Sequence, residues 1–140
     1  MKMKDALKKK GMFVKKLSNQ GELFRKRWEN EFASALSASQ KKKIYMDQFL
    51  WHAFSYEKLP CLQGEQAIQA FEQQIMNDCY LLFEHDERVL QLSKCEHLTS
   101  ADLSENTNMY LEDLYVVDKN FTWTYVITHE SSYGPYFYRT

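Results

Sequence analysis

The residues with the clearest potential for chemistry are two histidines and two glutamates: His52, Glu57, His129 and Glu130. Imidazole titrates near neutral pH and a carboxylate can orient it. Such a set can therefore bind a divalent transition metal or perform general acid–base catalysis. The four side chains converge only if a strand at residues 51–56 pairs near the end of a strand at residues 121–130.

Two features of the sequence weigh against this site. Neither an HExxH motif nor the Cys/His spacing of a zinc site is present. His129 and Glu130 are also adjacent, and neighbours in a regular strand point to opposite faces. A half-buried histidine that hydrogen-bonds a neighbouring group is the structural alternative. We therefore predict no metal site and keep the four residues only as candidates for catalysis.

Aromatic residues make up 15% of the chain, and many lie in its strand-rich part and C-terminal tail. Large aromatic side chains usually fill the core. One face of a sheet buries only some of them, however. Exposed Tyr and Trp favour protein–protein contact because each joins a large apolar body to a polar tip. The predicted binding residues are Trp51, Tyr56, Tyr133, Tyr136 and Tyr138.

The other reactive residues form no recognisable enzyme motif. Cys61, Cys79 and Cys95 are widely spaced without a CxxC pair, which favours reduced thiols in a cytoplasmic protein. The four glycines are not clustered, so we expect no phosphate-binding loop and no cofactor. Residues 1–13 lack the apolar stretch of a signal peptide, and no apolar run approaches the ~20 residues of a membrane-spanning helix. We expect no membrane partner.

Charge is distributed unevenly along the chain although the net charge is only −1. Residues 1–50 hold 13 Lys or Arg against five Asp or Glu, whereas residues 51–140 hold five against 14. A basic half attracts phosphates through counterion release, so nucleic-acid binding is one interpretation. Solvated helix faces are the other, and we favour it because no nucleic-acid-binding motif accompanies the charge.

Hydrophobic periodicity places several helices early in the chain. Residues 1–10 predict a short basic helix that Gly11 ends, and a short strand follows at residues 12–14. Asn19 and Glu22 have the spacing of a capping pair. They introduce the clearest helix, whose apolar face recurs at three- and four-residue steps: Phe24, Trp28, Phe32, Ala35 and Leu36.

Three further elements are predicted before the chain midpoint. Ser37 or Ser39 caps a helix through residues 41–48. The aromatic-rich residues 49–56 are expected to form a strand, with alternate side chains on opposite faces. Residues 64–76 predict a helix with an apolar inner face.

The period then changes from that of helices to that of strands. Residues 79–84 and 88–92 predict one hairpin, and residues 114–117 and 121–130 predict a second. The tail, residues 133–138, is expected to add an edge segment. The longest strand has one face with aromatic residues and one with Thr and Val: Phe121, Trp123, Tyr125, Ile127 and His129 against Thr122, Thr124, Val126, Thr128 and Glu130.

Helices followed by hairpins predict the α+β class. The length of 140 residues suits one domain with its own core, so we expect a single domain over residues 1–140. Its sheet is expected to be mainly antiparallel and built of hairpins, with the N-terminal helices packed on one face.

Four segments of the sequence also resemble one protein family: residues 50–58 (LWHAFSYEK), 61–71 (CLQGEQAIQAF), 114–130 (LYVVDKNFTWTYVITHE) and 134–137 (GPYF). They are similar to a family of short bacterial proteins known as domain of unknown function 4275. The resemblance extends over nearly the whole chain. It implies a free-standing cytoplasmic protein, and it brings no activity or catalytic residues with it.

Three hypotheses for function follow from the sequence. The first is a non-catalytic binding module that contacts another protein through its aromatic residues. The second is a small hydrolase or metal-dependent enzyme that uses His52, Glu57, His129 and Glu130. The third is nucleic-acid binding through the basic N-terminal half. We favour the first because aromatic residues are abundant and catalytic motifs are missing.

Overall fold

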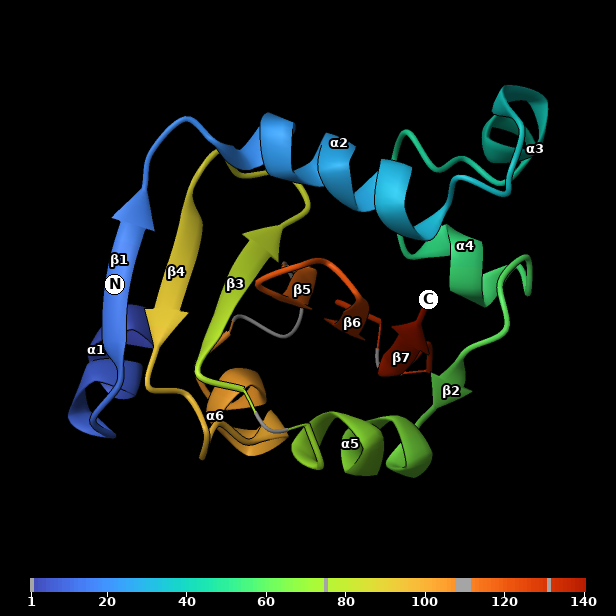
Figure 1. Cartoon of the computed structure of the whole chain (residues 1–140). Coiled ribbons are helices and arrows are strands. Elements are labelled where there is room, and N and C mark those ends of the chain that lie inside the picture. The colour runs from blue at the N-terminus through green and yellow to red at the C-terminus, as the bar shows by residue number, and fades with distance from the viewer. Residues whose placement is uncertain (1, 75, 108–111, 131) are drawn as a thin grey trace.

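The protein folds around one antiparallel β-sheet, as a computed structural model describes for residues 2–74, 76–107, 112–130 and 132–140 (Figure 1). Within these residues the sheet has seven strands in the order β1-β4-β3-β5-β6-β7-β2. The strands are β1 (Phe13–Leu17), β2 (Leu62–Gln63), β3 (Asp78–Phe83), β4 (Val89–Ser93), β5 (Leu114–Asp118), β6 (Trp123–Ile127) and β7 (Tyr136–Arg139).

Helices cover both faces of this sheet. The helices are α1 (Lys2–Lys9), α2 (Gly21–Phe32), α3 (Ala38–Lys43), α4 (His52–Ser55), α5 (Glu65–Glu72) and α6 (Ser100–Ser104). Figure 1 shows α2, α3 and α4 on one side of the sheet and α1, α5 and α6 on the other. The α+β class and the antiparallel sheet of hairpins are confirmed. The expected one-sided packing describes α2 to α4, and a second helical layer lies opposite.

Two apolar clusters explain why both faces are covered. On one face Trp123 and Tyr125 of β6 pack with Phe71 of α5, and the rings of Phe71 and Tyr125 stack with centroids 4.3 Å apart. On the other face the indole Nε1 of Trp28 donates to the Thr124 hydroxyl at 2.9 Å. The central strands are buried on both sides, so each face needs its own cover.

Both predicted hairpins are present. Strands β3 and β4 pair antiparallel, as do β5 and β6, and β1 adds to the outer edge of β4. The C-terminal tail was expected at the sheet edge, but β7 lies between β6 and β2. That prediction was wrong because the two-residue strand β2 pairs with the outer side of β7.

The predicted strand at residues 49–56 is absent, and the short helix α4 at His52–Ser55 lies there, flanked by turns. Backbone N–H groups of Phe54 and Ser55 donate to the carbonyl of Trp51, which is helical turn geometry. Leu50, Trp51 and Phe54 are all buried in the same cluster. Their spacing of one, three and four residues places them on one side of a helix, and this period was hidden because neighbouring positions are also aromatic.

The predicted capping pair Asn19–Glu22 was also wrong. The residue before α2 is Gln20, whose side chain forms no capping hydrogen bond. The N–H groups of Gln20 and Gly21 donate instead to the carbonyl of Glu87, at 2.9 and 2.8 Å. The turn between β3 and β4 therefore satisfies the start of α2, and a distant contact replaces a local one.

Candidate functional site

A cleft of about 350 Å³ opens where α4 meets the segment that follows β6. We call it the aromatic cleft. Its lining residues are Trp51, His52, Ser55, Tyr56, Glu130 and Tyr133. Five of these six residues are among the candidates that the sequence analysis selected. The fold brings them together although about 75 positions separate the two segments in the sequence.

The rings of the aromatic cleft pack against one another. The Trp51 ring centroid lies 4.8 Å from that of His52 and 5.8 Å from that of Tyr133. The rings of His52 and Tyr56 are 5.2 Å apart, with an angle of 68° between their planes. Such edge-to-face pairs hold aromatic side chains in fixed orientations. The cleft wall is therefore a preformed set of ring surfaces.

Two polar atoms of the cleft wall have defined hydrogen-bonding states. His52 Nδ1 lies 2.6 Å from the carbonyl oxygen of Ile44, and a carbonyl can only accept, so Nδ1 carries a proton. The Trp51 indole Nε1 is buried and has no acceptor within the described residues. This donor is enclosed by the core and is not open to a group bound in the cleft.

The segment after β6 holds Glu130 and Tyr133 at the cleft rim. The hydroxyl oxygen of Thr128 lies 2.8 Å from the carbonyl of Glu130 and 2.5 Å from that of Tyr133. The backbone N–H of Tyr133 also donates to Glu130 O at 3.0 Å. These contacts hold Glu130 and Tyr133 close to Thr128.

His129 was expected on the opposite face from Glu130, but β6 ends at Ile127 and strand alternation does not apply to either residue. The buried carboxylate of Asp113 accepts hydrogen bonds from the His129 backbone N–H at 2.7 Å and from Nδ1 at 2.8 Å. His129 Nε2 lies 3.5 Å from Glu130 Oε1. The imidazole is thus held between two carboxylates.

The four catalytic candidates are only partly brought together. His52 and Glu130 line the same cleft, and the ring centroids of His129 and Trp51 lie 6.0 Å apart. Glu57 is exposed and does not line the cleft. No group of three or more His, Cys, Asp or Glu in the described part of the chain is arranged to hold a metal ion.

The five predicted binding residues differ in accessibility. Tyr56 and Tyr133 are exposed, at 47% and 45% of their surface. Trp51 and Tyr136 are only 2% and 1% exposed, so their rings fill the core, although Trp51 still reaches the cleft wall. Tyr138 is half-buried and packs against Phe54.

Sequence reasoning missed Glu84, which follows β3 and is only 7% exposed. Its Oε1 accepts hydrogen bonds from the Tyr115 hydroxyl and from the Leu50 N–H, the latter at 2.9 Å. The Tyr115 hydroxyl in turn accepts from the Trp51 N–H at 3.1 Å. Glu84 thus fixes the backbone that leads into α4. The only signal in the sequence was a carboxylate that directly follows an apolar strand.

Burial raises the pKa of Glu84 to about 7. The hydrogen bonds from Tyr115 and Leu50 oppose this shift, as does the positive charge of Arg25, whereas the negative charge of Asp113 adds to it. The desolvation of the carboxylate outweighs the opposing contacts. Glu84 therefore changes charge near neutral pH, at the base of the segment that carries Trp51 and His52.

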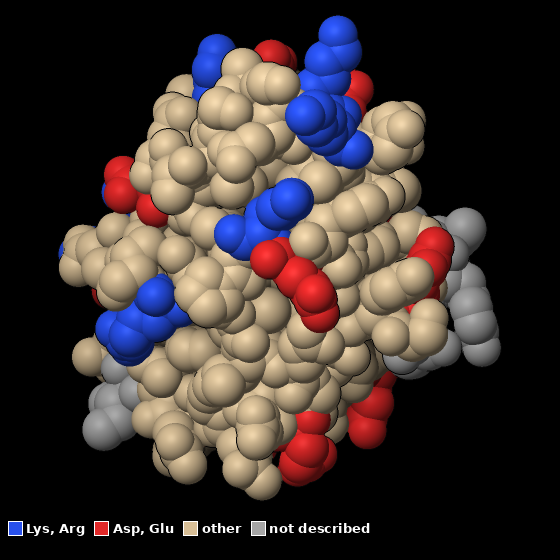
Figure 2. Space-filling view, turned by 90° about the vertical axis from the view of Figure 1, so that its right-hand side faces the viewer, with Lys and Arg blue, Asp and Glu red and all other residues tan. Residues whose placement is uncertain are grey.

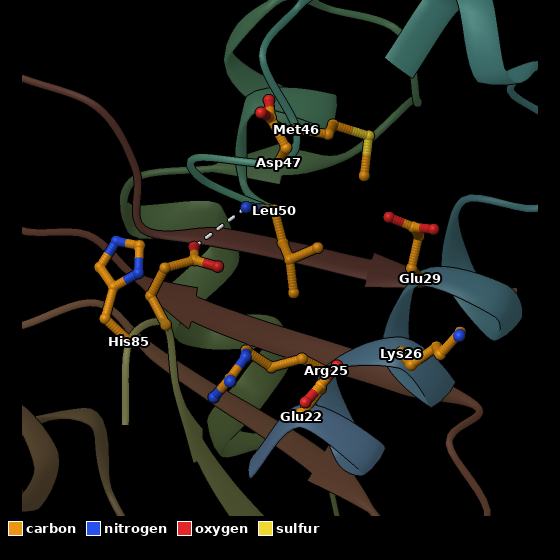
Figure 3. Close-up of a pocket in the computed structure, with 9 residues that line it drawn as sticks. Glu22, Arg25, Lys26, Glu29, Met46, Asp47, Leu50 and His85 are labelled. Atoms are coloured by element: carbon orange, nitrogen blue, oxygen red, sulfur yellow. Dashed lines mark hydrogen bonds between the residues drawn. The ribbon is translucent and has the colours of Figure 1, made fainter. Parts of the chain in front are cut away.

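Glu84 also lines a second, more polar cavity of about 440 Å³ (Figure 3). Charged side chains of α2 line one side of it, His85 lies across from them, and Met46, Asp47 and Leu50 form another wall. The guanidinium of Arg25 donates to the carbonyls of Phe83 and Asp86, at 3.0 and 2.5 Å. Its hydrogen bonds therefore join α2 to the end of β3 and the turn that follows it.

The ring of Phe49 connects the two hollows. Its centroid lies 5.3 Å from that of His52, 5.1 Å from that of His129 and 5.6 Å from that of His85. His52 lines the aromatic cleft and His85 lines the polar cavity. The segment with Phe49, Leu50 and Trp51 is therefore the wall that both hollows share.

Figure 2 shows the side of the molecule with α3, α4 and β2. Most of this face is neither basic nor acidic, and its charged side chains stand singly or in small groups of both signs. None of the helices in the described part of the chain has the length and hydrophobicity needed to cross a membrane.

Comparison with known proteins identifies a family. No curated protein and no solved structure matches the chain. One family model does match, over residues 1–137 of the 140, and it is described as Domain of unknown function (DUF4275). The match includes both segments that form the aromatic cleft, and it confirms the resemblance found in the sequence. The chain therefore belongs to the DUF4275 family.

Proposed function

We propose that this protein is a non-catalytic binding module of the cytoplasm that holds a segment of another protein in the aromatic cleft. The observation that carries the proposal is the pair Tyr56 and Tyr133, both exposed at one cleft. Tyr133 packs against the buried Trp51 ring, and Tyr56 packs against the half-buried ring of His52. Exposed Tyr side chains on a rigid base are typical of residues that dominate binding energy at interfaces. The cytoplasmic location is supported by three free cysteines.

The size of the cleft supports the same proposal. The cleft volume of about 350 Å³ is within the range of ligand pockets, so it can admit side chains together with a short stretch of backbone.

Peptide display tests this function. A random dodecapeptide library is selected on the wild-type protein, and the selected peptides are then measured against two variants. The double variant Tyr56→Ala/Tyr133→Ala removes the cleft rim, whereas Tyr45→Ala removes an equally exposed ring elsewhere (54% exposed). We expect peptides that bind the wild type and the Tyr45 variant but lose at least tenfold in affinity with the double variant. A library that yields no binders would overturn the proposal, and so would peptides that bind the double variant as tightly as the wild type.

A second candidate function, a small hydrolase, is favoured by one observation. His52 and Glu130 line the same cleft, and the contact of Nδ1 with Ile44 leaves Nε2 as the basic nitrogen of a neutral imidazole. Hydrolysis of a panel of nitrophenyl esters tests it. Turnover that His52→Gln abolishes supports the hydrolase, and equal rates for the variant and the wild type exclude it.

A further inference from the structure

We infer that the aromatic cleft recognises a basic side chain, Lys or Arg, of the partner protein. The inference rests on the proposed function and names the chemistry of the partner. Its basis is the combination of two exposed Tyr rings and one carboxylate in a single cleft.

The ring faces favour a cation over an anion. Tyr56 and Tyr133 contribute two exposed aromatic rings, and the face of an aromatic ring carries the negative part of its quadrupole. A cation within about 6 Å of such a ring is attracted. An anion in the same place would be repelled by the rings.

The charge of the cleft has the matching sign. Among the described residues that line the cleft, Glu130 is the only carboxylate and none is a Lys or Arg. The Glu130 side chain is 47% exposed, so its carboxylate can reach a bound cation while solvent still screens it. His129 Nε2 lies 3.5 Å from Glu130 Oε1. A bound Lys or Arg would give Glu130 a charged hydrogen-bond donor. We therefore place the basic side chain beside the exposed rings of Tyr56 and Tyr133, within reach of the Glu130 carboxylate.

The test uses the peptides selected by display and synthetic analogues of them. Each Arg is replaced by citrulline and each Lys by norleucine, which keep the shape and remove the charge. We expect the dissociation constant to rise about 3- to 30-fold with the neutral analogues. Glu130→Gln should weaken the charged peptide and leave the neutral analogue unchanged. Glu57→Gln, a carboxylate outside the cleft, should change neither.

The possible results separate the inference from the proposed function. One result would be that binding requires Tyr56 and Tyr133 but is equally tight with citrulline or norleucine in the peptide. It would overturn the recognition of a basic side chain and would leave the proposed peptide-binding function intact. Methylguanidinium that binds as tightly as the peptides, at the same residues, overturns the protein partner and indicates a site for small cations. Failure of every peptide to bind overturns both.

Discussion

Replacement of Glu84 by Gln should remove a distinct part of the pH dependence of stability. Gln keeps an oxygen that can accept from the Tyr115 hydroxyl and the Leu50 N–H, so the local contacts survive. The substitution removes only the titratable group. The wild-type carboxyl has a pKa raised from its ordinary 4.5 to about 7, mainly because burial disfavours the charged form.

The sign and size follow from the two pKa values. Between pH 4.5 and pH 7 the folded protein holds a proton on Glu84 that the unfolded chain has released. The stability from this group is fully present below pH 4.5 and is lost as the pH rises through 7. A shift of about 2.5 pKa units corresponds to about 3 kcal/mol in the free energy of unfolding.

The assay is urea unfolding followed by tryptophan fluorescence at pH 4.5, 5.5, 6.5, 7.5 and 8.5. The free energy of unfolding of the wild type should fall by up to about 3 kcal/mol more across this range than that of Glu84→Gln. Other titrating groups are common to both proteins, so the difference between the two curves isolates Glu84. Glu31→Gln removes an exposed carboxylate from α2 and serves as the control.

Parallel curves for the wild type and Glu84→Gln would refute the reasoning, because they would mean that the carboxyl titrates alike in both states. A steeper fall of the free energy of unfolding with pH in the Gln variant than in the wild type would also refute it, since that result requires a lowered pKa of Glu84 in the folded protein. The Glu31→Gln curve should follow that of the wild type.

Three further predictions concern the packing that supports the site, each measured as the free energy of urea unfolding. Gly21→Ala should cost about 1–3 kcal/mol, because the added methyl would lie 2.2 Å from the Asp86 carbonyl oxygen; unchanged stability would contradict the close approach of α2 to the β3–β4 turn. Thr124→Val should cost about 1–3 kcal/mol by leaving the Trp28 indole N–H without its acceptor, and wild-type stability would disprove that hydrogen bond. Phe71→Ala should cost about 3–5 kcal/mol through loss of a fully buried ring, and a change below 1 kcal/mol would show that α5 is not docked on β6.

The strands could be predicted because their pattern is local. Trp123 and Tyr125 alternate with Thr124 and Val126, and the structure places the first two in one cluster while Val126 belongs to the other. The second face of this strand is also informative. Thr124 and Val126 are fully buried too, so that face also required helices, and α2 covers it through Trp28.

The helix α4 could not be predicted because its sequence satisfies two periods at once. Aromatic residues occupy both alternating and helical positions in residues 49–56, and composition favours a strand. The deciding contacts are distant: the N–H groups of Leu50 and Trp51 are fixed by Glu84 and Tyr115, more than 30 residues away. Secondary-structure propensity is a local property and gives no information about such distant partners.

These distant contacts explain why the aromatic cleft was found by residue type but not by geometry. Trp51 and Tyr133 were selected as aromatic candidates, yet their meeting depends on a carboxylate after β3 and a hydroxyl on β5. One oxygen of Glu84 accepts hydrogen bonds from the Leu50 N–H and the Tyr115 hydroxyl, at a buried position that disfavours the charged form of the carboxyl group. A neutral Gln could accept the same hydrogen bonds without that penalty. The carboxylate therefore costs stability at neutral pH, and what it adds is a dependence of the cleft's supporting backbone on protonation.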